Sequence, residues 1–408
     1  MRPFVWLRIW PPAADKNHFM IGVIADDLTG AAELGAVGLR HGLRSEIVLI
    51  GQPSGKADIV CVDTDSRAQT AVEAARRATA AATMLRRAGA DWIYKKVDSV
   101  LRGQVIAEIE AVMLQLRLQR TLLLPANPSL GRTIQDGKYF IRGRLIHKTD
   151  FAKDPQYPRR SARVLELLKT PQHFSIGLGK LAGPISTEGI VVAEASSSAA
   201  VRQWAARREA GTLMAGGAEF FGALLAMEPG VKPPRTPKTV AANGAGREFF
   251  ISGSSSSAAR KFTTAARRNK TPVFSLPQEL AWGAELLPMV ATNLGQRIVT
   301  AFGSHSRVLL TVGLPLVRDV EVSERLSGHV VQIAESALRQ VDVGRVYADG
   351  GATAVELVRR MGWPRLEVVR ELAPGVATLA IAGKKSMLLT IKPGSYAWPA
   401  QWTGQGAI

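Results

Sequence analysis

The stretch Ile21–Ala32, IGVIADDLTGAA, decides how the first part of this chain folds. The residues Ile21–Ala25 have the length and composition of a buried strand, and the pattern over 31–41 is helical. Asp26 and Asp27 follow the strand directly, where ligands bind in open parallel sheets. Because buried unpaired carboxylates are costly, we expect both to face a ligand, a cation or a basic side chain. The alternative is that one of them only caps the helix.

Strand patterns alternate with helix patterns along most of the chain. The predicted strands are Ile21–Ala25, Glu46–Ile50, Ile59–Val62, Asp91–Tyr94, Thr121–Leu124 and Ile190–Ala193, then Glu248–Ile251, Pro272–Ser275, Val308–Val312, Arg345–Ala348 and Ser386–Ile391. The predicted helices cover 31–41, 69–88, 103–117, 160–169, 198–210, 257–269, 284–296, 320–339 and 354–361. This alternation is typical of an α/β fold with mostly parallel sheets.

A proline-rich stretch, PGVKPPRTPK at 229–238, divides the pattern into two α/β halves. The predicted segments are an extension at 1–19 that we expect to be disordered, a first domain at 20–228, a linker at 229–247 and a second domain at 248–408. Met20 is a candidate start residue. Clefts between domains are favoured ligand sites, so we expect a ligand cleft between the two domains.

The composition disfavours several classes of protein. No stretch is both apolar and uncharged over the roughly 18 residues that a membrane-spanning helix needs. Pro11 and Pro12 interrupt the apolar start of the chain, which disfavours a signal peptide. The single cysteine, Cys61, lies within an apolar strand pattern and fits a reducing compartment. We therefore expect a cytoplasmic protein with no membrane partner.

The strongly basic balance of the chain, a net charge of +18 with a pI near 10.4, raises nucleic acid as a partner. Its arginines, however, are scattered along predicted helices rather than gathered on one arm. Aromatic residues make up only 6% of the chain and do not alternate with basic runs, as stacking platforms for single strands require. We expect no nucleic acid partner and keep a basic nucleic-acid binder as the weakest alternative.

Polar loops follow three more predicted strands of the first half. They are VDTDSR at 62–67, YKKVDSVLRG at 94–103 and LPANPSLGRT at 124–133. Parallel pairing brings all of these loops and the Asp26–Asp27 pair to one edge of a sheet. Arginine and lysine bind carboxylates, and aspartate and serine bind hydroxyl groups. This edge is therefore suited to a small polyhydroxylated anion.

Two turns of small residues follow strands in the second half. They are Ser252-Gly253-Ser254-Ser255-Ser256-Ser257 and Asp349-Gly350-Gly351-Ala352-Thr353, and each leads into a predicted helix. Backbone amides at such turns and at helix N-termini bind phosphate groups. Neither turn is a P-loop or a Rossmann motif. The histidines have no metal-ligand spacing, so we predict no metal site formed by protein residues alone and expect Mg²⁺ to arrive with a nucleotide.

At this point the sequence resembles the four-carbon acid sugar kinase family, which phosphorylates threonate, erythronate or related sugar acids with ATP. The resemblance spans residues 20 to about 396. The matching motifs are ADDLTGA at 25–31, DTDSR at 63–67, KKVDSVLRG at 95–103, PANPSLGRT at 125–133, KTDFAKDP at 148–155, SGSSSS at 252–257, GGATA at 350–354, ELAPGV at 371–376 and LTIKPGS at 389–395. The resemblance implies a sugar-acid-binding first domain and an ATP-binding second domain.

The resemblance also assigns roles to single residues. The implied substrate-binding residues are Asp26, Asp27, Arg67, Lys95, Lys96, Asp98, Ser99 and Arg102, of which Asp27, Asp98 and Lys96 are the candidate catalytic residues. The implied nucleotide-binding residues are Ser254, Ser256, Gly350, Gly351, Ala352, Thr353 and Gly394. Asp27 or Asp98 would orient or deprotonate the hydroxyl that is phosphorylated, and these two roles are interchangeable at this stage.

Three positions depart from the family pattern. The family usually has an aspartate at the position of Ala352, Asn-Asp at Ala32-Glu33, and a turn richer in glycine than Lys392–Ser395. Ala352 motivates the main alternative, a catalytically weakened relative that binds a sugar acid as a sensor or scaffold. The sequence leaves open the sugar acid, its stereochemistry and whether the chain forms a homodimer.

Overall fold

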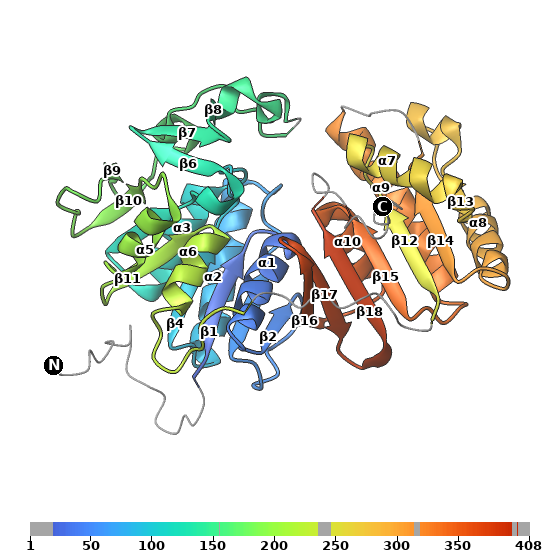
Figure 1. Ribbon diagram of the computed structural model, residues 1–408, viewed down its shortest axis with the longest axis horizontal. Helices are drawn as coiled ribbons and strands as arrows, with labels where there is room; N and C mark the ends of the chain where they lie inside the picture. Colours follow the sequence, from blue (N-terminus) through green and yellow to red (C-terminus); the bar gives the residue numbers. More distant parts are fainter. Residues whose placement is uncertain (1–18, 155, 236–245, 314–318, 394–397, 399–408) are drawn as a thin grey trace. The chain divides into compact units, whose positions relative to one another are not determined.

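The computed structural model describes residues 19–154, 156–235, 246–313, 319–393 and 398. The chain divides into two compact units, Met1–Thr236 and Pro237–Ile408, called here the N-terminal and C-terminal units (Figure 1). Each unit is an α/β structure with a mostly parallel sheet, which confirms the predicted fold class. The predicted extension and linker lie largely outside the described residues, so the exact domain boundaries stay predictions.

The sheet of the N-terminal unit is parallel throughout its described strands. In spatial order these are β2 (Ser45–Val48), β3 (Ile59–Asp63), β1 (Ile21–Ala25), β4 (Trp92–Lys96), β11 (Thr212–Gly216), β5 (Arg120–Leu124), β10 (Gly189–Ala193) and β9 (Ile176–Gly179). Because β3, β1 and β4 are neighbours, the loops after them share one edge of the sheet. This is the edge that the sequence predicts as a ligand site.

Helices cover both faces of this sheet (Figure 1). On one face lie α1 (Leu28–Arg40), α5 (Ser198–Ala205) and α6 (Ala218–Leu225), and on the other lie α2 (Ala71–Arg87) and α3 (Val105–Leu116). Right-handed crossovers explain this division, since α1 and α5 connect strands in one direction along the sheet and α2 and α3 in the other. The short helix α4 (Val164–Leu167) follows separately.

A small antiparallel sheet is inserted after β5. It consists of β6 (Arg132–Gln135), β7 (Lys138–Ile141) and β8 (Arg144–Leu145), flanked by the 3-10 helices η1 (Pro128–Leu130), η2 (Ile146–Lys148) and η3 (Asp150–Lys153). The sequence analysis did not predict these strands. Their side chains reach the edge described above, as shown below.

The strands of the C-terminal unit are also hydrogen-bonded side by side. Their order is β13 (Val273–Ser275), β14 (Arg307–Thr311), β12 (Glu248–Ser252), β15 (Arg345–Asp349), β18 (Lys384–Lys392), β17 (Val376–Ile381) and β16 (Arg365–Ala373). The first five strands are parallel, and the last two join antiparallel. One face carries α7 (Ser257–Arg268), and the other carries α8 (Pro288–Ala301), α9 (Val320–Leu338) and α10 (Gly351–Arg360); η4 (Gln278–Trp282) precedes α8.

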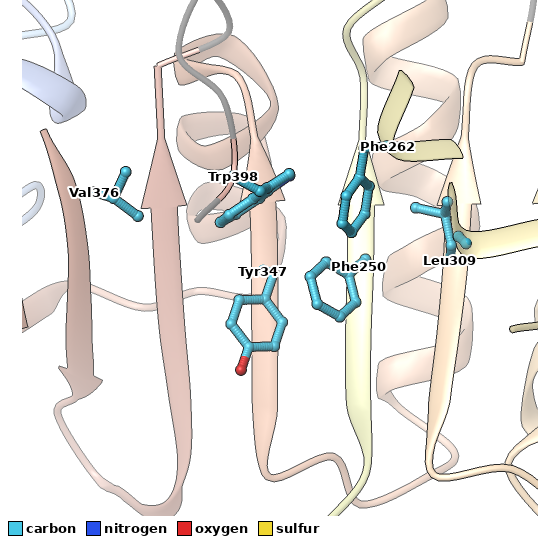
Figure 2. Packing of buried hydrophobic residues seen from close by; sticks show 7 residues of the cluster. Phe250, Phe262, Leu309, Tyr347, Val376 and Trp398 are labelled. Atoms are coloured by element: carbon cyan, nitrogen blue, oxygen red, sulfur yellow. The ribbon is translucent and has the colours of Figure 1, made fainter. Parts of the chain in front are cut away.

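An aromatic cluster fills the face of this sheet that α7 covers (Figure 2). The rings of Phe250 on β12 and Tyr347 on β15 are stacked, with centroids 4.3 Å apart. Trp398 meets both rings edge-on at 5.9 Å, and Phe262 of α7 packs beside Phe250. Trp398 therefore completes the core next to the strand ends that carry the glycine turn at 350.

Two differences from the predicted elements bear on the site. Helix α1 begins at Leu28 rather than at residue 31, because Asp27 caps it. Strand β4 runs to Lys96 rather than ending at Tyr94, so Lys95 and Lys96 are strand residues rather than loop residues. Among the helices of the described residues, none has the length and apolar character that crossing a membrane requires.

Candidate functional site

Asp27 has two structural roles at the start of α1. Its Oδ1 accepts a hydrogen bond from the backbone N–H of Gly30 at 2.7 Å, and its Oδ2 accepts one from the Thr29 hydroxyl at 2.5 Å. A Cβ at position 30 would lie 2.8 Å from Oδ1 of Asp27, so the turn requires glycine there. Asp27 is thus a helix cap, as the alternative interpretation held, and its Oδ2 also takes part in the ion pairs described next.

Arg67 joins three carboxylates. Its Nε and Nη2 donate to the two oxygens of Asp26 at 2.8 and 2.9 Å, and its Nη1 donates to Oδ2 of Asp27 at 2.7 Å. The same Nη1 lies 3.8 Å from Oδ2 of Asp98. Burial would raise the pKa of Asp26, but the guanidinium of Arg67 outweighs burial and lowers that pKa. Asp26 is almost fully buried, so its main effect is to fix Arg67.

Asp98 is held by a second arginine. The Nε and Nη2 of Arg102 donate to its two oxygens at 3.0 and 2.9 Å, and the backbone N–H groups of Val100 and Arg102 donate at 3.1 Å. Burial would raise the pKa of Asp98, but Arg102 and Arg67 outweigh it and hold this pKa well below its usual range. Asp98 is therefore ionised and suited to accept a hydrogen bond rather than a proton.

The two adjacent lysines of β4 face opposite sides of the sheet, since side chains alternate along a strand. Lys95 pairs with Glu108 of α3 at 2.6 Å, and both side chains are no more than 2% exposed. Lys96 lies 3.3 Å from Glu33 of α1, and its Nζ would lie 3.7 Å from a Cβ at Gly30. Lys96 therefore lies beside the Asp27 turn, and the charge of Lys95 helps to lower the pKa of Asp26 from its place in a buried ion pair. The predicted substrate contact of Lys95 stays untested, and its position favours an internal ion pair.

Four carboxylates act on the charge of Lys96. Burial would lower its pKa, but Glu33, Asp26, Asp27 and Asp98 outweigh burial and raise it. The ammonium group is therefore fully charged at neutral pH. Lys96 contacts Glu33 and donates to the carbonyl of Val97 at 2.9 Å, so the cation is fixed before any ligand binds.

The inserted sheet fixes the loop after β4. Arg132 of β6 donates to the hydroxyl of Ser99, and the hydroxyl of Tyr139 on β7 donates to the Ser99 carbonyl. Arg102 also approaches Asp154 of the same insertion, at 3.4 Å. Ser99 and Arg102 thus lie beside Asp98 as the sequence implies. The hydroxyl of Tyr157 also donates to the carbonyl of Arg67. The supporting residues Glu33, Glu108, Tyr139, Asp154 and Tyr157 were not predicted as site residues. Asp154 lies in the KTDFAKDP motif and Glu33 at a position that departs from the family pattern, whereas no local sequence signal points to the other three.

In the C-terminal unit, the serine-rich turn after β12 caps α7. The hydroxyl of Ser256 accepts a hydrogen bond from the backbone N–H of Ala259 at 3.2 Å, and the hydroxyl of Ser254 accepts one from the N–H of Ser256 at 3.2 Å. Gly253 lies against the hydroxyl groups of Ser327 and Thr353, where no Cβ fits. This turn therefore brings the backbone close to the start of α10.

The turn after β15 leaves backbone donors unused by the helix. Gly350 has a φ of +107°, which favours glycine, and no described side chain caps α10, which begins at Gly351. The N–H groups of Gly351 and Ala352 consequently lack intrahelical partners. Thr353 is buried, and its hydroxyl lies 3.0 Å from that of Ser327, so Thr353 can offer a ligand only its backbone. Gly394 lies outside the described residues.

A buried ion pair supports this turn. Nζ of Lys392 lies 2.5 Å from Oδ1 of Asp349, and both side chains are no more than 2% exposed. The carbonyl of Lys392 accepts a hydrogen bond from the N–H of Gly350 at 3.0 Å. Burial outweighs Lys392 and raises the pKa of Asp349. Among the described residues, no three His, Cys, Asp or Glu side chains are grouped to hold a metal ion.

Comparisons with known proteins fit this geometry. Residues 21–220 match the sugar-binding N-terminal domain family, and residues 249–396 match the nucleotide-binding C-terminal domain family. The D-threonate kinase of Salmonella typhimurium strain LT2 is 27% identical over 388 residues, which cover 86% of this chain and 89% of that protein. The chain belongs to the four-carbon acid sugar kinase family.

Other members of the four-carbon acid sugar kinase family have a similar sequence identity to this chain. The 3-oxo-tetronate kinase of Pseudomonas savastanoi pv. phaseolicola is 26% identical, with 92% of this chain and 94% of that protein covered. The D-erythronate kinase of Heliobacterium modesticaldum is 25% identical, with 86% and 88% covered. A crystal structure of Haemophilus influenzae protein HI1011 has the same fold, with a TM-score of 0.71, 21% identity and coverage of 95% of this chain and 100% of that one.

Proposed function

We propose that this chain transfers the γ-phosphate of ATP to a hydroxyl group of a small four-carbon sugar acid such as threonate or erythronate. The family and the kinase names of its relatives support phosphotransfer to such acids. The observation that carries the proposal is the group of Asp27, Arg67, Lys96 and Asp98 at three adjacent strand ends, where fixed cations lie beside fixed carboxylates.

The charges suggest a role for each residue of this group. Lys96 is fully charged and lies beside the Asp27 turn, so it binds the carboxylate or the developing negative charge of the substrate, and Arg67 assists. Asp98, whose pKa is strongly lowered, orients a hydroxyl. Asp27 is the candidate that takes the proton, because Asp98 is already bonded to four N–H donors. Ser99 and Arg102 lie beside Asp98 and are candidates for further substrate contacts.

The nucleotide is proposed to bind at the glycine turn of the C-terminal unit. Unused N–H groups at Gly351 and Ala352 suit phosphate oxygens, and the backbone at Ser254, Ser256 and Gly350 lets an anion approach closely. The carboxylate that the family usually has at position 352 is not needed for this contact, since the backbone supplies the donors. Mg²⁺ bound to ATP would neutralise phosphate charge during the transfer.

The test is an assay that measures the rate of ADP release with each candidate sugar acid. Purified protein is given ATP with D-threonate, D-erythronate or 3-oxo-tetronate, and we expect a clear preference for one acid. Asp27→Asn should lower kcat/KM by about a hundredfold or more, as loss of a general base does. Asp136→Asn, which removes an exposed carboxylate in the β6–β7 turn, is the matched control and should leave kcat/KM unchanged.

Two outcomes would contradict the proposal. If no sugar acid increases ADP release, four-carbon sugar acids are not the substrates. If Asp27→Asn keeps full activity, Asp27 has no part in the mechanism. Calorimetry with ATP separates the sensor alternative, which predicts sugar-acid binding without nucleotide binding.

A further inference from the structure

The N-terminal unit contains a cavity of about 400 Å³ outside the proposed sugar-acid site. It lies between the start of α2, one side of α3 along most of its length, and residues of the segment 157–173. Small and apolar side chains line most of it, among them Val72, Ala75, Ala107, Ala111 and Leu168. The side chains that line it do not include Asp27, Arg67, Lys96 or Asp98. Its volume lies in the range of small-molecule sites.

A buried arginine lines this cavity without a carboxylate partner. Arg159 is 6% exposed, and its described hydrogen bonds go to the backbone carbonyls of Tyr157 at 2.8 Å and Leu101 at 3.3 Å. Asp98 and Asp154 favour its charge from a distance, but no described carboxylate forms an ion pair with it. Burial lowers the pKa of Arg159, the direction expected for a buried guanidinium whose described hydrogen bonds go to backbone carbonyls. A buried cation in this state favours an anion as its partner.

The cavity lining contains two more charged groups besides Arg159. The carboxylate of Glu110 accepts hydrogen bonds from the backbone N–H groups of Gln172, His173 and Phe174, so its charge is held by backbone donors rather than by Arg159. Lys169 donates to the side-chain oxygen of Gln104 at 2.7 Å and adds a second positive charge. The cavity therefore combines an apolar wall with two cations and one carboxylate that backbone donors already hold.

We propose that this cavity binds a small amphipathic carboxylate, with its carboxylate on Arg159 and its hydrocarbon tail along the alanine and leucine side chains of α2 and α3. The guanidinium fork suits a carboxylate, and the apolar wall suits a short alkyl chain. A bare sugar acid lacks the tail that this wall would bury. Octanoate is therefore the probe of choice.

The cavity adjoins the backbone of the proposed substrate site. The hydroxyl of Tyr157, which lines the cavity, donates to the carbonyl of Arg67, and Gly103 lies against Arg67. Leu101 and Gly103, also in the cavity wall, flank Arg102, which holds Asp98. If the chain is the kinase proposed above, an occupant of the cavity should change the KM for the sugar acid, because the two sites share this wall.

Calorimetry with octanoate tests the binding itself and needs no kinase activity. We expect saturable binding to the full chain, at least tenfold weaker binding to Arg159→Gln, and unchanged binding to Arg160→Gln. Arg160 is exposed and adjacent in sequence, so it is the matched control for removing one positive charge. Octylamine has a similar tail with the opposite charge and should bind at least tenfold more weakly than octanoate.

A second variant keeps the proposal testable should Arg159→Gln fail to fold. Ala111→Phe fills the cavity from a half-exposed position of α3 and leaves Arg159 in place, so it should abolish octanoate binding. Equal octanoate affinity in Ala111→Phe or in folded Arg159→Gln, or equal affinity for octylamine, would overturn the proposal. If the ADP-release assay shows no kinase activity, the octanoate binding result is unaffected. The proposed function and the proposed octanoate site can therefore be rejected independently.

Discussion

The two units approach an anionic ligand in different ways. The N-terminal unit presents side chains, in which Arg67, Lys96 and Arg102 are each fixed by carboxylates of the protein. The C-terminal unit presents backbone N–H groups, whose positions depend on a glycine with positive φ and on the buried Asp349–Lys392 pair below it. In the proposed function, the first arrangement would select a substrate by the positions of its charges, and the second would bind phosphate groups through backbone donors.

This difference predicts which substitutions each unit tolerates. In a network of paired charges, removing one member leaves another buried and unpaired, so single substitutions cost more than the lost contact. At a turn built from backbone donors, a substitution matters only when it changes the backbone or fills the space of the ligand. The following substitutions test this contrast, from the largest expected effect to the smallest.

Lys95→Met should lower the free energy of unfolding by about 3–5 kcal/mol, because it leaves Glu108 buried without its cation. Chemical denaturation measures this loss. The double variant Lys95→Met/Glu108→Leu removes both charges and should recover a large part of it. A loss below about 1 kcal/mol in the single variant would mean that Glu108 finds another partner.

Lys96→Met should lower kcat/KM for the sugar acid by about a hundredfold to a thousandfold, the loss that removing one fixed donor to developing charge causes. ATP affinity, measured by calorimetry, should stay within twofold. Lys56→Met removes an exposed lysine of the same unit and serves as control. An equal loss in both variants would mean that net charge, rather than the position of Lys96, sets the rate.

Gly350→Ala should raise the KM for ATP about tenfold, since a side chain at a φ of +107° costs roughly 1–3 kcal/mol and shifts the turn. Gly362→Ala, just after the C-terminal end of α10, introduces comparable strain at a φ of +66° where the space is open. This control should lower stability and leave the KM for ATP unchanged. Equal KM values in both variants would contradict a phosphate site at Gly350.

Ser256→Ala should cost about 1 kcal/mol of stability through loss of the α7 cap. It should also weaken ATP binding severalfold if this turn contacts phosphate. Ser197→Ala removes the equivalent cap of α5 in the N-terminal unit and should lower stability by a similar amount without changing ATP binding. Calorimetry and thermal unfolding of the two variants separate capping from ligand contact.

Much of the site was predictable because its residues follow apolar strands directly. Asp27, Arg67 and Asp98 come after β1, β3 and β4, and parallel pairing alone brings these positions together. The alternative interpretations of Asp27, helix cap and ion-pair partner, both hold, because its two oxygens serve different donors. The turn at Gly350 was predictable for a similar reason, since adjacent glycines follow a strand and precede a helix.

The parts that were not predicted depend on contacts between distant residues. The sequence predicts that β4 ends at Tyr94. In the structure the strand continues through Lys95 and Lys96, and because side chains alternate along a strand, Lys95 is internal and Lys96 faces the proposed site. Tyr139 reaches Ser99 from a small sheet whose strands are only two to four residues long, too short to show a clear strand pattern. Strand β11 contains two small residues in five, Ala215 and Gly216, and gave no strong strand pattern although it lies at the centre of its sheet.

The pair Lys95–Lys96 has a consequence for how this chain can vary. The two ammonium groups differ in role because successive residues of one strand face opposite sides of the sheet, so a shift of β4 by a single residue would turn each of them to the other face. Depending on its direction, the shift would bring Lys96 to the position beside Glu108 or Lys95 to the ligand edge, but not both, and every apolar neighbour would turn to the wrong face. We therefore expect a deletion or insertion within Trp92–Lys96 to damage the protein more than almost any single substitution there. The length of this strand matters because it sets which lysine faces the proposed site.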